Sequence, residues 1–253
     1  MFSIFWHLFF FDPIYNLFIF ILNHVRGGDV GIAIILLTIL IKVLLLPLSL
    51  RAAKTQYAMH TLEPELARIK ETHTGNREKI AKETMEAYKN AGINPFASIL
   101  LTLIQIPILI SLYFSVSRGG GVALPNINTA LLYAFVPAPE TVDMIFLGIV
   151  DIAAKSLPLA LLAGITQCMH TKLTLPVLAP REETAEPKSN FKDDFARSMQ
   201  IQMRYVMPAV IFFVAYRFSA TIALYFLISN IIAIGQEYVV RRHIPTQGLE
   251  KKS

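Results

Sequence analysis

The sequence is short of charge and of cysteine. Charged residues make up 16% of its 253 residues, whereas a soluble globular domain carries about 25%. The single cysteine, Cys168, cannot form an internal disulfide or a Cys-x-x-Cys metal site. The sequence also lacks a phosphate-binding loop, a zinc-protease motif, a serine-hydrolase motif and an acidic metal cluster. We therefore expect neither a soluble domain nor an enzyme, and no metal or cofactor.

Long hydrophobic runs take the place of the missing charge. Hydrophobic residues make up 54% of the chain, in blocks of about 18 to 20 residues that are long enough to cross the hydrocarbon core as helices. The blocks predict spans at about 30–48, 96–116, 157–173, 204–218 and 220–238. With their ends they occupy the segments 30–50, 95–117, 157–173 and the hairpin 204–238. The predicted fold is an all-α integral membrane protein with a core bundle of five transmembrane helices.

The N-terminal segment 1–29 holds a further apolar stretch from Phe2 to Val25. Asp12-Pro13 interrupts this stretch, and its aromatic residues, Trp6 among them, are typical of the water–lipid interface. We expect a helix that lies on the membrane surface, and a sixth span is the alternative. No basic region with a cleavage site marks a signal peptide, so we expect the aromatic N-terminus to belong to the mature protein.

The distribution of cations predicts the orientation. Eighteen of the 23 Lys and Arg residues lie in or next to the segments 51–94, 174–203 and 239–253. Only four lie in the opposite segments, and these are Arg26, Arg118, Lys155 and Arg217. Because cytoplasmic loops carry the excess of Lys and Arg, the first three segments and the C-terminus are predicted to be cytoplasmic. Segments 1–29 and 118–156 then face outward.

The connecting segments differ in character. Segment 51–94 has apolar residues at steps of three and four, and the His73-Thr-Gly-Asn76 stretch ends one helix and caps the next at Asn76, so we expect a cytoplasmic helical hairpin. The simplest interpretation of this segment is a solvated coiled coil that has no catalytic or binding role. Segment 174–203 reads as a flexible connection. The outward loop has two short apolar runs, 131–136 and 144–150, which we expect against the membrane surface.

Lys42 is the one cation predicted to lie inside a span. An ammonium there is costly unless it faces the bundle interior or water, so it indicates a functional site. The alternative is snorkelling, because Lys42 is six residues before Leu48, about 9 Å along a helix, and a lysine stem covers most of that distance.

Other polar residues occur at a similar depth in four of the predicted spans. In a continuous helix Thr38, Lys42 and Ser49 share one face. The further members of the polar stripes that we single out are Thr102, Gln105, Tyr225, Ser229 and Asn230. Such residues pair between helices in many membrane proteins. Their common depth with a cation among them favours a hydrated pocket that opens to the cytoplasm.

These features together resemble the YidC/Oxa/Alb family of membrane protein insertases, in the bacterial form without the large periplasmic domain. The resemblance covers nearly the whole chain in order, from "LFFFDPIYNLFIFILNHV" through "GIAIILLTILIKVLLLPLSLRAAKTQ" and "LIQIPILISLYF" to "MPAVIFFVAYRFSATIALYFLISNIIAIGQEYVVRR". In that family an arginine stands five residues before the proline that closes the first span, and Lys42 stands five before Pro47 here. Lysine keeps the charge but not the bidentate fork of arginine. Ser219-Ala220-Thr221 replaces the family's Pro-Ser-Gly turn.

The resemblance implies a function and its partners. The chain would insert and help to fold nascent membrane proteins in the bacterial inner membrane, through a hydrophilic groove where Lys42 attracts acidic substrate flanks, without nucleotide hydrolysis. Apolar side chains would guide the substrate into lipid, and these are Ile106, Ile110, Phe212 and Phe213. A Sec-type translocon is a further implied partner. The basic tail is placed to contact ribosomal RNA or anionic lipid.

Two other functions remain open from the residues. A small secondary transporter or channel would use the same hydrated pocket, although the sequence shows no internal repeat. A non-catalytic assembly scaffold would use the polar stripes only to hold helices together.

Overall fold

The computed structural model describes residues 2–73, 75–92, 96–118, 121–174 and 202–243. These residues are mostly helical, and they fall into two compact units. Unit 1 comprises Met1–Val43 and Gln105–Ile234, and unit 2 comprises Leu44–Ile104 and Gly235–Ser253. Each unit is described by itself. The predicted connection 174–203 and the end of the basic tail, from residue 244, lie outside the described residues, except for 174, 202 and 203.

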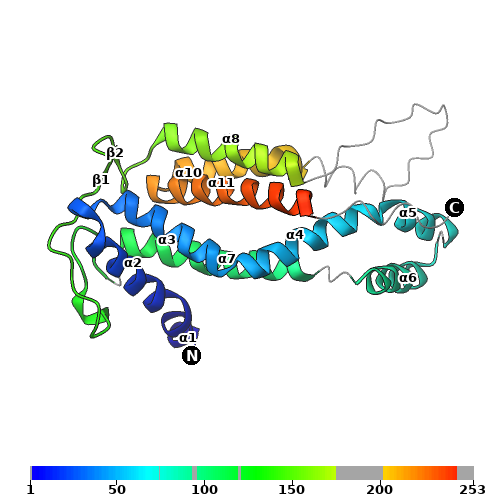
Figure 1. The fold of residues 1–253 in the computed structure, drawn as a ribbon, viewed down its shortest axis with the longest axis horizontal. Coiled ribbons are helices and arrows are strands. Elements are labelled where there is room, and N and C mark those ends of the chain that lie inside the picture. Colours follow the sequence, from blue (N-terminus) through cyan, green and yellow to red (C-terminus); the bar gives the residue numbers. More distant parts are fainter. Residues whose placement is uncertain (1, 74, 93–95, 119–120, 175–201, 244–253) are drawn as a thin grey trace. The chain divides into compact units, whose positions relative to one another are not determined.

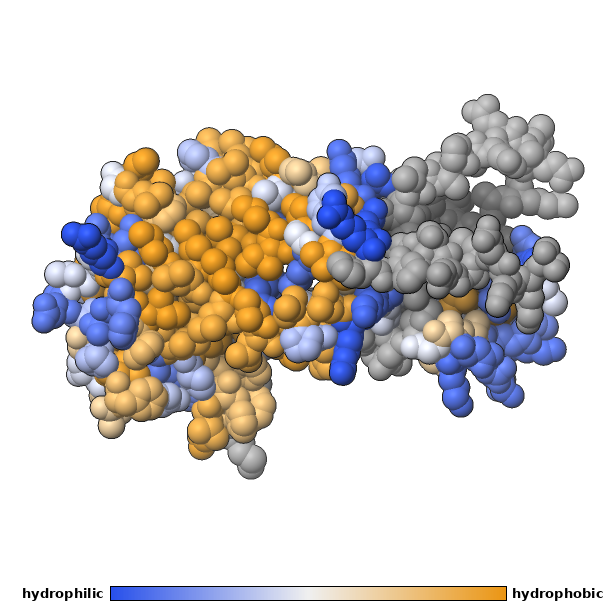
Figure 2. Space-filling model, viewed as in Figure 1, coloured by the Kyte–Doolittle hydropathy of each residue, from blue (hydrophilic) through white to orange (hydrophobic). Residues whose placement is uncertain are grey.

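Unit 1 is a bundle of apolar helices. Its elements are α1 (Phe2–Trp6), η1 (His7–Phe11), α2 (Asp12–His24), α3 (Val30–Leu44), α7 (Phe96–Ser117), α8 (Leu157–Thr174), η4 (Gln202–Val206), α10 (Met207–Arg217) and α11 (Ala220–His243), of which α3, α7 and α11 extend into unit 2. Figure 1 shows α3, α7, α8, α10 and α11 running nearly parallel to one another, with α1 and α2 inclined to them. In Figure 2 the visible face of these helices is almost continuously hydrophobic.

The expected N-terminal helix is present. Residues 2–24 form one helical run, because η1 is a π-helical turn that leads directly into α2. Pro13 lies just after this turn, so Asp12-Pro13 interrupts the apolar sequence without ending the helix. The run Ser3–His24 is long and apolar enough to cross a membrane. Its place on the surface or across the membrane stays a prediction.

The first predicted span is not one continuous helix. α3 ends at Leu44, and α4 (Leu46–Thr61) begins after a break at Leu45. The predicted common face of Thr38, Lys42 and Ser49 required an unbroken helix, so this argument no longer includes Ser49. Among the described residues two helices are long and apolar enough to span a membrane, or three if the broken pair α3 and α4 counts as one.

Residues 121–156 connect α7 to α8, and we call this part of unit 1 the loop end. It contains a short 3-10 turn, η3 (Thr129–Leu131), and an antiparallel pair of strands, β1 (Ile145–Phe146) and β2 (Val150–Asp151). The apolar run 144–150 therefore forms a small hairpin in a chain expected to be all-α. The chain turns here because Gly148 and Leu147 both adopt positive φ.

Unit 2 contains the helices of the expected hairpin. These are α4, α5 (Glu63–Thr72) and α6 (Arg77–Asn90), and α5 packs against α6. Asn76 accepts a hydrogen bond from the backbone N–H of Lys79 at 3.0 Å, which confirms the predicted helix cap. His73 Nε2 lies 2.8 Å from Glu83 Oε2 and so links the turn to α6. Figure 2 shows mostly hydrophilic side chains on the visible face of α6.

Candidate functional site

Lys42 lies near the end of α3, one turn beyond the last buried residue of this helix. Thr38 is fully buried, and its hydroxyl donates to the carbonyl of Ile34 at 2.7 Å, so this group is satisfied within the helix. From residue 39 to residue 44 no side chain is buried. Lys42 is half-buried and has no acidic side chain of the described residues within ion-pair distance. Its ammonium therefore has to be satisfied by water or by another molecule.

The burial of α7 and α11 changes along their length in the same way. On α7 the buried side chains lie within 108–116, and the described ones from 100 to 107 are at least partly exposed. On α11 every residue from 220 to 225 is buried, and farther along unit 1 only Ser229 and Asn230 are. The helices of unit 1 thus pack tightly next to the loop end and lose burial away from it.

Polar groups mark the level of this change. Lys42, Gln105 and Ser229 lie about 14 to 18 Å from the loop end of their helices, at 1.5 Å per residue. This is about half of the 30 Å of hydrocarbon in a bilayer. Three helices of unit 1 therefore carry a polar group at a similar distance from the loop end, and their common depth in a membrane stays a prediction.

Three of these polar side chains hold buried atoms without a hydrogen-bond partner. The atoms are Gln105 Nε2, Tyr225 Oη and Ser229 Oγ. Tyr225 and Ser229 are 1% and 6% exposed, and their hydroxyls interact with each other on α11 but with no other polar group of the described residues. A buried polar atom left unpaired costs about 1 to 3 kcal/mol. This cost disappears if water or a polar group of another molecule reaches these atoms.

Asn230 has a different role from the one expected. Its side-chain amide donates to the carbonyl of Ala163 and to the hydroxyl of Thr166 on α8, both at 3.3 Å. This side chain therefore holds α11 against α8. The sequence does not distinguish such an interhelical contact from a binding residue, because both place a polar group inside the bundle.

Three of the four predicted guiding side chains lie on the surface of unit 1. Ile106, Ile110 and Phe213 are 50%, 37% and 63% exposed. Phe212 instead packs on α8, because Gly164 leaves room for its Cβ, and its ring stacks on Tyr216. Thr102 lies on the part of α7 that belongs to unit 2, and its side chain is outside the described set.

The loop end is bound to the helices by polar contacts that the sequence analysis missed. Asp29 accepts hydrogen bonds from the N–H groups of Ile32 and Leu147, so it caps α3 and holds the β-hairpin at once. Thr221 donates to the carbonyl of Ile152 at 3.1 Å. An aspartate directly before an apolar helix is a recognisable N-cap, whereas its second contact is not visible in the sequence.

The described ranges show no metal centre at this site. They hold no group of three or more His, Cys, Asp or Glu side chains placed around one ion. A cavity of about 480 Å³ lies at the loop end beside Leu22 and Glu140, and another of about 270 Å³ lies beside the N-terminal helix. Neither is lined by Lys42, Gln105, Tyr225 or Ser229.

Comparison with known proteins gives one consistent result. The model of a family described as "60Kd inner membrane protein" matches residues 21–247. The chain is 32% identical over 219 residues to the membrane protein insertase YidC of Syntrophobacter fumaroxidans, which covers 84% of this chain and 34% of that protein. It is 31% identical over 227 residues to YidC of Francisella tularensis subsp. novicida, covering 88% and 35%. The chain thus spans about a third of the length of these relatives.

Proposed function

This chain belongs to the 60Kd inner membrane protein family, that of YidC/Oxa/Alb, and on this premise we propose that it is a membrane protein insertase. It is a mostly helical protein with apolar helices able to span a bacterial inner membrane. It would place nascent membrane proteins into that membrane without nucleotide hydrolysis. Its core would consist of five spans with an N-terminal interfacial helix and a cytoplasmic hairpin.

The observation that carries the proposal is the set of polar atoms without partners at mid-depth. Lys42 and Gln105 Nε2 need water or a ligand, and the neighbouring hydroxyls of Tyr225 and Ser229 keep hydrogen-bonding capacity that water or a ligand can use. Their helices lose burial on the side away from the loop end. This supports a hydrated groove that begins at these residues and opens on that side.

The charge distribution supports the direction of the groove. The segments rich in Lys and Arg are those predicted to be cytoplasmic, and the loop end carries few cations. The loop end would therefore face outward, closed by the contacts of Asp29 and Thr221, with the C-terminus in the cytoplasm. A polar segment could enter the groove from the cytoplasm and move halfway across without contacting hydrocarbon.

In the proposed mechanism the polar flank of the substrate moves through the hydrated groove, and its apolar segment moves into lipid. Lys42 attracts acidic residues of the flank, and Gln105, Tyr225 and Ser229 exchange hydrogen bonds between water and its polar groups. A charged residue at the centre of a membrane helix costs about 2.5 to 3.5 kcal/mol, and hydration of the groove lowers this cost. The exposed side chains of Ile106, Ile110 and Phe213 guide the apolar segment into lipid.

The energy for insertion then comes from the substrate itself. Each Leu, Ile, Phe or Val near the centre of the bilayer contributes about 0.3 to 0.6 kcal/mol in favour of insertion. Over a segment of about 20 residues this outweighs the cost of a short polar flank, so no hydrolysed nucleotide is required. The partners are nascent membrane proteins and lipids, with a Sec-type translocon and the ribosome as further proposals.

Insertion of a short single-span test protein, in cells depleted of their own insertase, tests the proposal. We expect the chain to restore insertion and Lys42→Ala to slow it most for substrates with an acidic outward tail. One acidic residue about 4 Å from Lys42 gains about 1 kcal/mol in bulk water and about 4 near a protein surface. A hydrated groove lies toward the lower value, so we expect a loss of about tenfold, or 1.4 kcal/mol.

The controls separate the insertase from its mechanism. Lys42→Arg should keep activity, and Lys155→Ala, which removes an exposed cation of the loop end, should leave it unchanged. No restoration by a well-expressed chain would overturn the insertase proposal and favour a transporter or a scaffold. Equal activity of the parent and both Lys42 variants on every substrate would refute the role of the charge alone.

A further inference from the structure

A second cavity, lined mainly by apolar groups, lies between the N-terminal helical run and the residues at the C-terminal end of α7. Its volume is about 270 Å³, and it is open to the surface. The residues that line it are Trp6, His7, Phe11, Phe114, Arg118 and Gly121. None of them belongs to the candidate site described above, and the proposed insertion mechanism does not use them.

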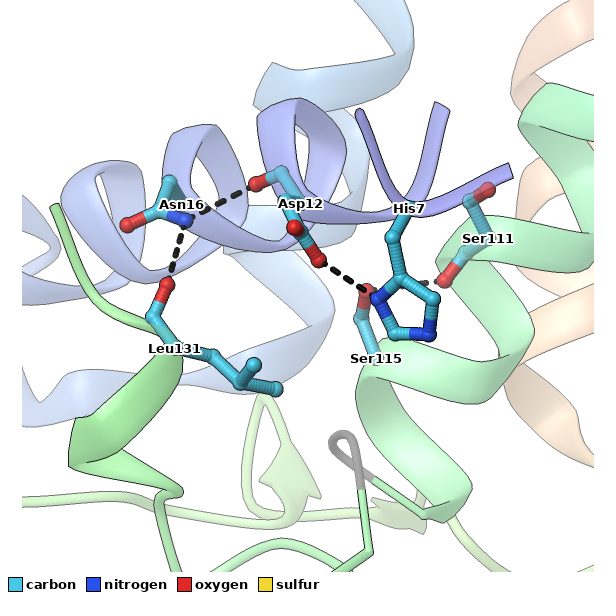
Figure 3. Close-up of polar contacts among 6 residues, drawn as sticks. All are labelled: His7, Asp12, Asn16, Ser111, Ser115 and Leu131. Carbon is cyan, nitrogen blue, oxygen red and sulfur yellow. Dashed lines mark hydrogen bonds and ion pairs between the residues drawn. The ribbon is translucent and has the colours of Figure 1, made fainter. Parts of the chain in front are cut away.

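His7 faces this cavity in a defined protonation arrangement. Its Nδ1 lies 2.9 Å from Oδ1 of Asp12, as Figure 3 shows. Because a carboxylate only accepts hydrogen bonds, Nδ1 carries the hydrogen and donates it. In the neutral ring Nε2 is then an acceptor. The cavity thus contains an acceptor nitrogen that suits a ligand with a hydrogen-bond donor.

Arg118 provides hydrogen-bond donors, whereas His7 provides an acceptor. It directly follows α7, it is exposed, and no ion pair holds it among the described residues. A guanidinium with free N–H groups binds phosphate through paired, charge-assisted hydrogen bonds. A ligand that fills the cavity would therefore carry a phosphate near Arg118 and a donor near His7.

The surroundings indicate that this ligand also has an apolar part. Aromatic rings of Trp6, Phe11 and Phe114 line the cavity. The same helical run exposes large apolar side chains, each at least half exposed, and these are Ile4, Phe5, Leu8 and Phe9. Tryptophan beside a cation at the end of an apolar helix is typical of the level of lipid head groups.

We propose that this cavity binds the head group of a phospholipid that carries a hydrogen-bond donor, with phosphate on Arg118 and the donor on Nε2 of His7. Phosphatidylethanolamine has such a donor in its ammonium group. Phosphatidylcholine has the same net charge but no donor, so it is the matched comparison. The site would fix the N-terminal helix to the loop end through a lipid.

Trp6 provides a direct probe, because it is the only tryptophan of the chain and it lines the cavity. The purified full chain in detergent is titrated with phosphatidylethanolamine or phosphatidylcholine, each with the same brominated acyl chains, which quench tryptophan fluorescence on contact. We expect phosphatidylethanolamine to quench at about three- to tenfold lower concentration, the range that one net hydrogen bond gives. Equal quenching by both lipids would overturn the proposal.

Variants of His7 and Arg118 test the two proposed contacts, to the donor and to the phosphate of the head group. His7→Phe should remove the preference for phosphatidylethanolamine and leave phosphatidylcholine unchanged. Arg118→Gln should weaken both lipids by about tenfold, as expected for a hydrogen bond to a charged group. Arg217→Gln, which changes an exposed arginine at the end of α10, is the matched control and should have no effect. Unchanged quenching with Arg118→Gln contradicts the phosphate contact.

Two competition measurements use the unaltered chain, so misfolding of a variant cannot affect their result. Unlabelled phosphatidylethanolamine should restore the fluorescence quenched by its brominated form, and unlabelled phosphatidylcholine should do so only at higher concentration. Excess inorganic phosphate should not restore it, since a free anion lacks the apolar part. Recovery with inorganic phosphate would instead identify a simple anion site and refute a lipid site.

Discussion

Replacing Asn16 by leucine tests how the N-terminal helix is fixed to the loop end. The Asn16 side chain is 2% exposed and makes three hydrogen bonds. Its amide donates to the carbonyls of Asp12 and Leu131, both at 2.9 Å, and its oxygen accepts from the N–H of Tyr133 at 2.6 Å (Figure 3 shows the two donated bonds). Leucine has a similar size and can make none of these bonds.

The expected cost follows from the groups left behind. Removal of the amide leaves the carbonyl of Leu131 and the N–H of Tyr133 without this partner. An unpaired buried group costs about 1 to 3 kcal/mol, and these two are part-buried, so their sum lies below the full value for two buried groups. We expect a loss of about 2 to 5 kcal/mol. On the scale of soluble domains of this size, this lowers the melting temperature by roughly 4 to 20 °C.

Thermal unfolding in detergent and amide hydrogen exchange measure this effect. Asn23→Leu is the matched control, because Asn23 is on the same helix and is only half-buried. Asn16→Leu should also speed exchange of the Tyr133 amide, with little change in unit 2. If Asn16→Leu is as stable as Asn23→Leu and exchange at Tyr133 is unchanged, the hydrogen bonds do not hold the loop end.

Two further predictions concern packing in unit 1. Gly31→Ala should destabilise the protein by about 1 to 3 kcal/mol in the same unfolding assay, because the new Cβ would collide with the ring of Phe146. Gly235→Ala is the control and should be neutral or stabilising, because a Cβ at this position has open space around it. Asn230→Ala should cost about 0.6 kcal/mol, typical of one interhelical polar contact in a membrane, measured by unfolding in mixed detergent. A loss above 3 kcal/mol for Asn230→Ala, or a stable Gly31→Ala, would contradict these contacts.

The sequence predicts the helices well where one local signal is strong. The apolar runs that became α7, α8 and α11 lie within a few residues of their expected positions, because length and lack of charge leave few alternatives. Asn76 was recognised as a cap because its side chain satisfies a backbone donor only three residues away.

The errors concern features that local patterns do not determine. Asp12-Pro13 interrupts the apolar sequence, and local patterns do not show that residues 2–24 continue through it as one helical run. The apolar run 30–48 was expected to form one helix, yet the helix breaks at Leu45, two residues before Pro47. The β-hairpin at 145–151 is held to α3 by Asp29, more than 110 residues earlier, which accepts a hydrogen bond from Leu147.

The candidate site also combines features that local sequence patterns determine with features that depend on contacts between distant residues. The sequence places Lys42, Gln105 and Ser229 at one depth, since depth depends on position along each helix. It treats Asn230 and Phe212 in the same way as their neighbours, although one contacts α8 through hydrogen bonds and the other packs against Gly164. Whether a polar group is paired depends on distances between residues far apart in the chain.

The sequence by itself determined that this protein is built from apolar helices, belongs to a family of membrane proteins and carries a cation among them. It did so because hydrophobic run length, charge and residue order are local properties. Only the tertiary structure decided which buried polar atoms lack partners, which residues hold the loop end, and that Trp6, His7 and Arg118 share a cavity. These features depend on contacts between helices, and each arises from groups that the chain brings together only when it folds.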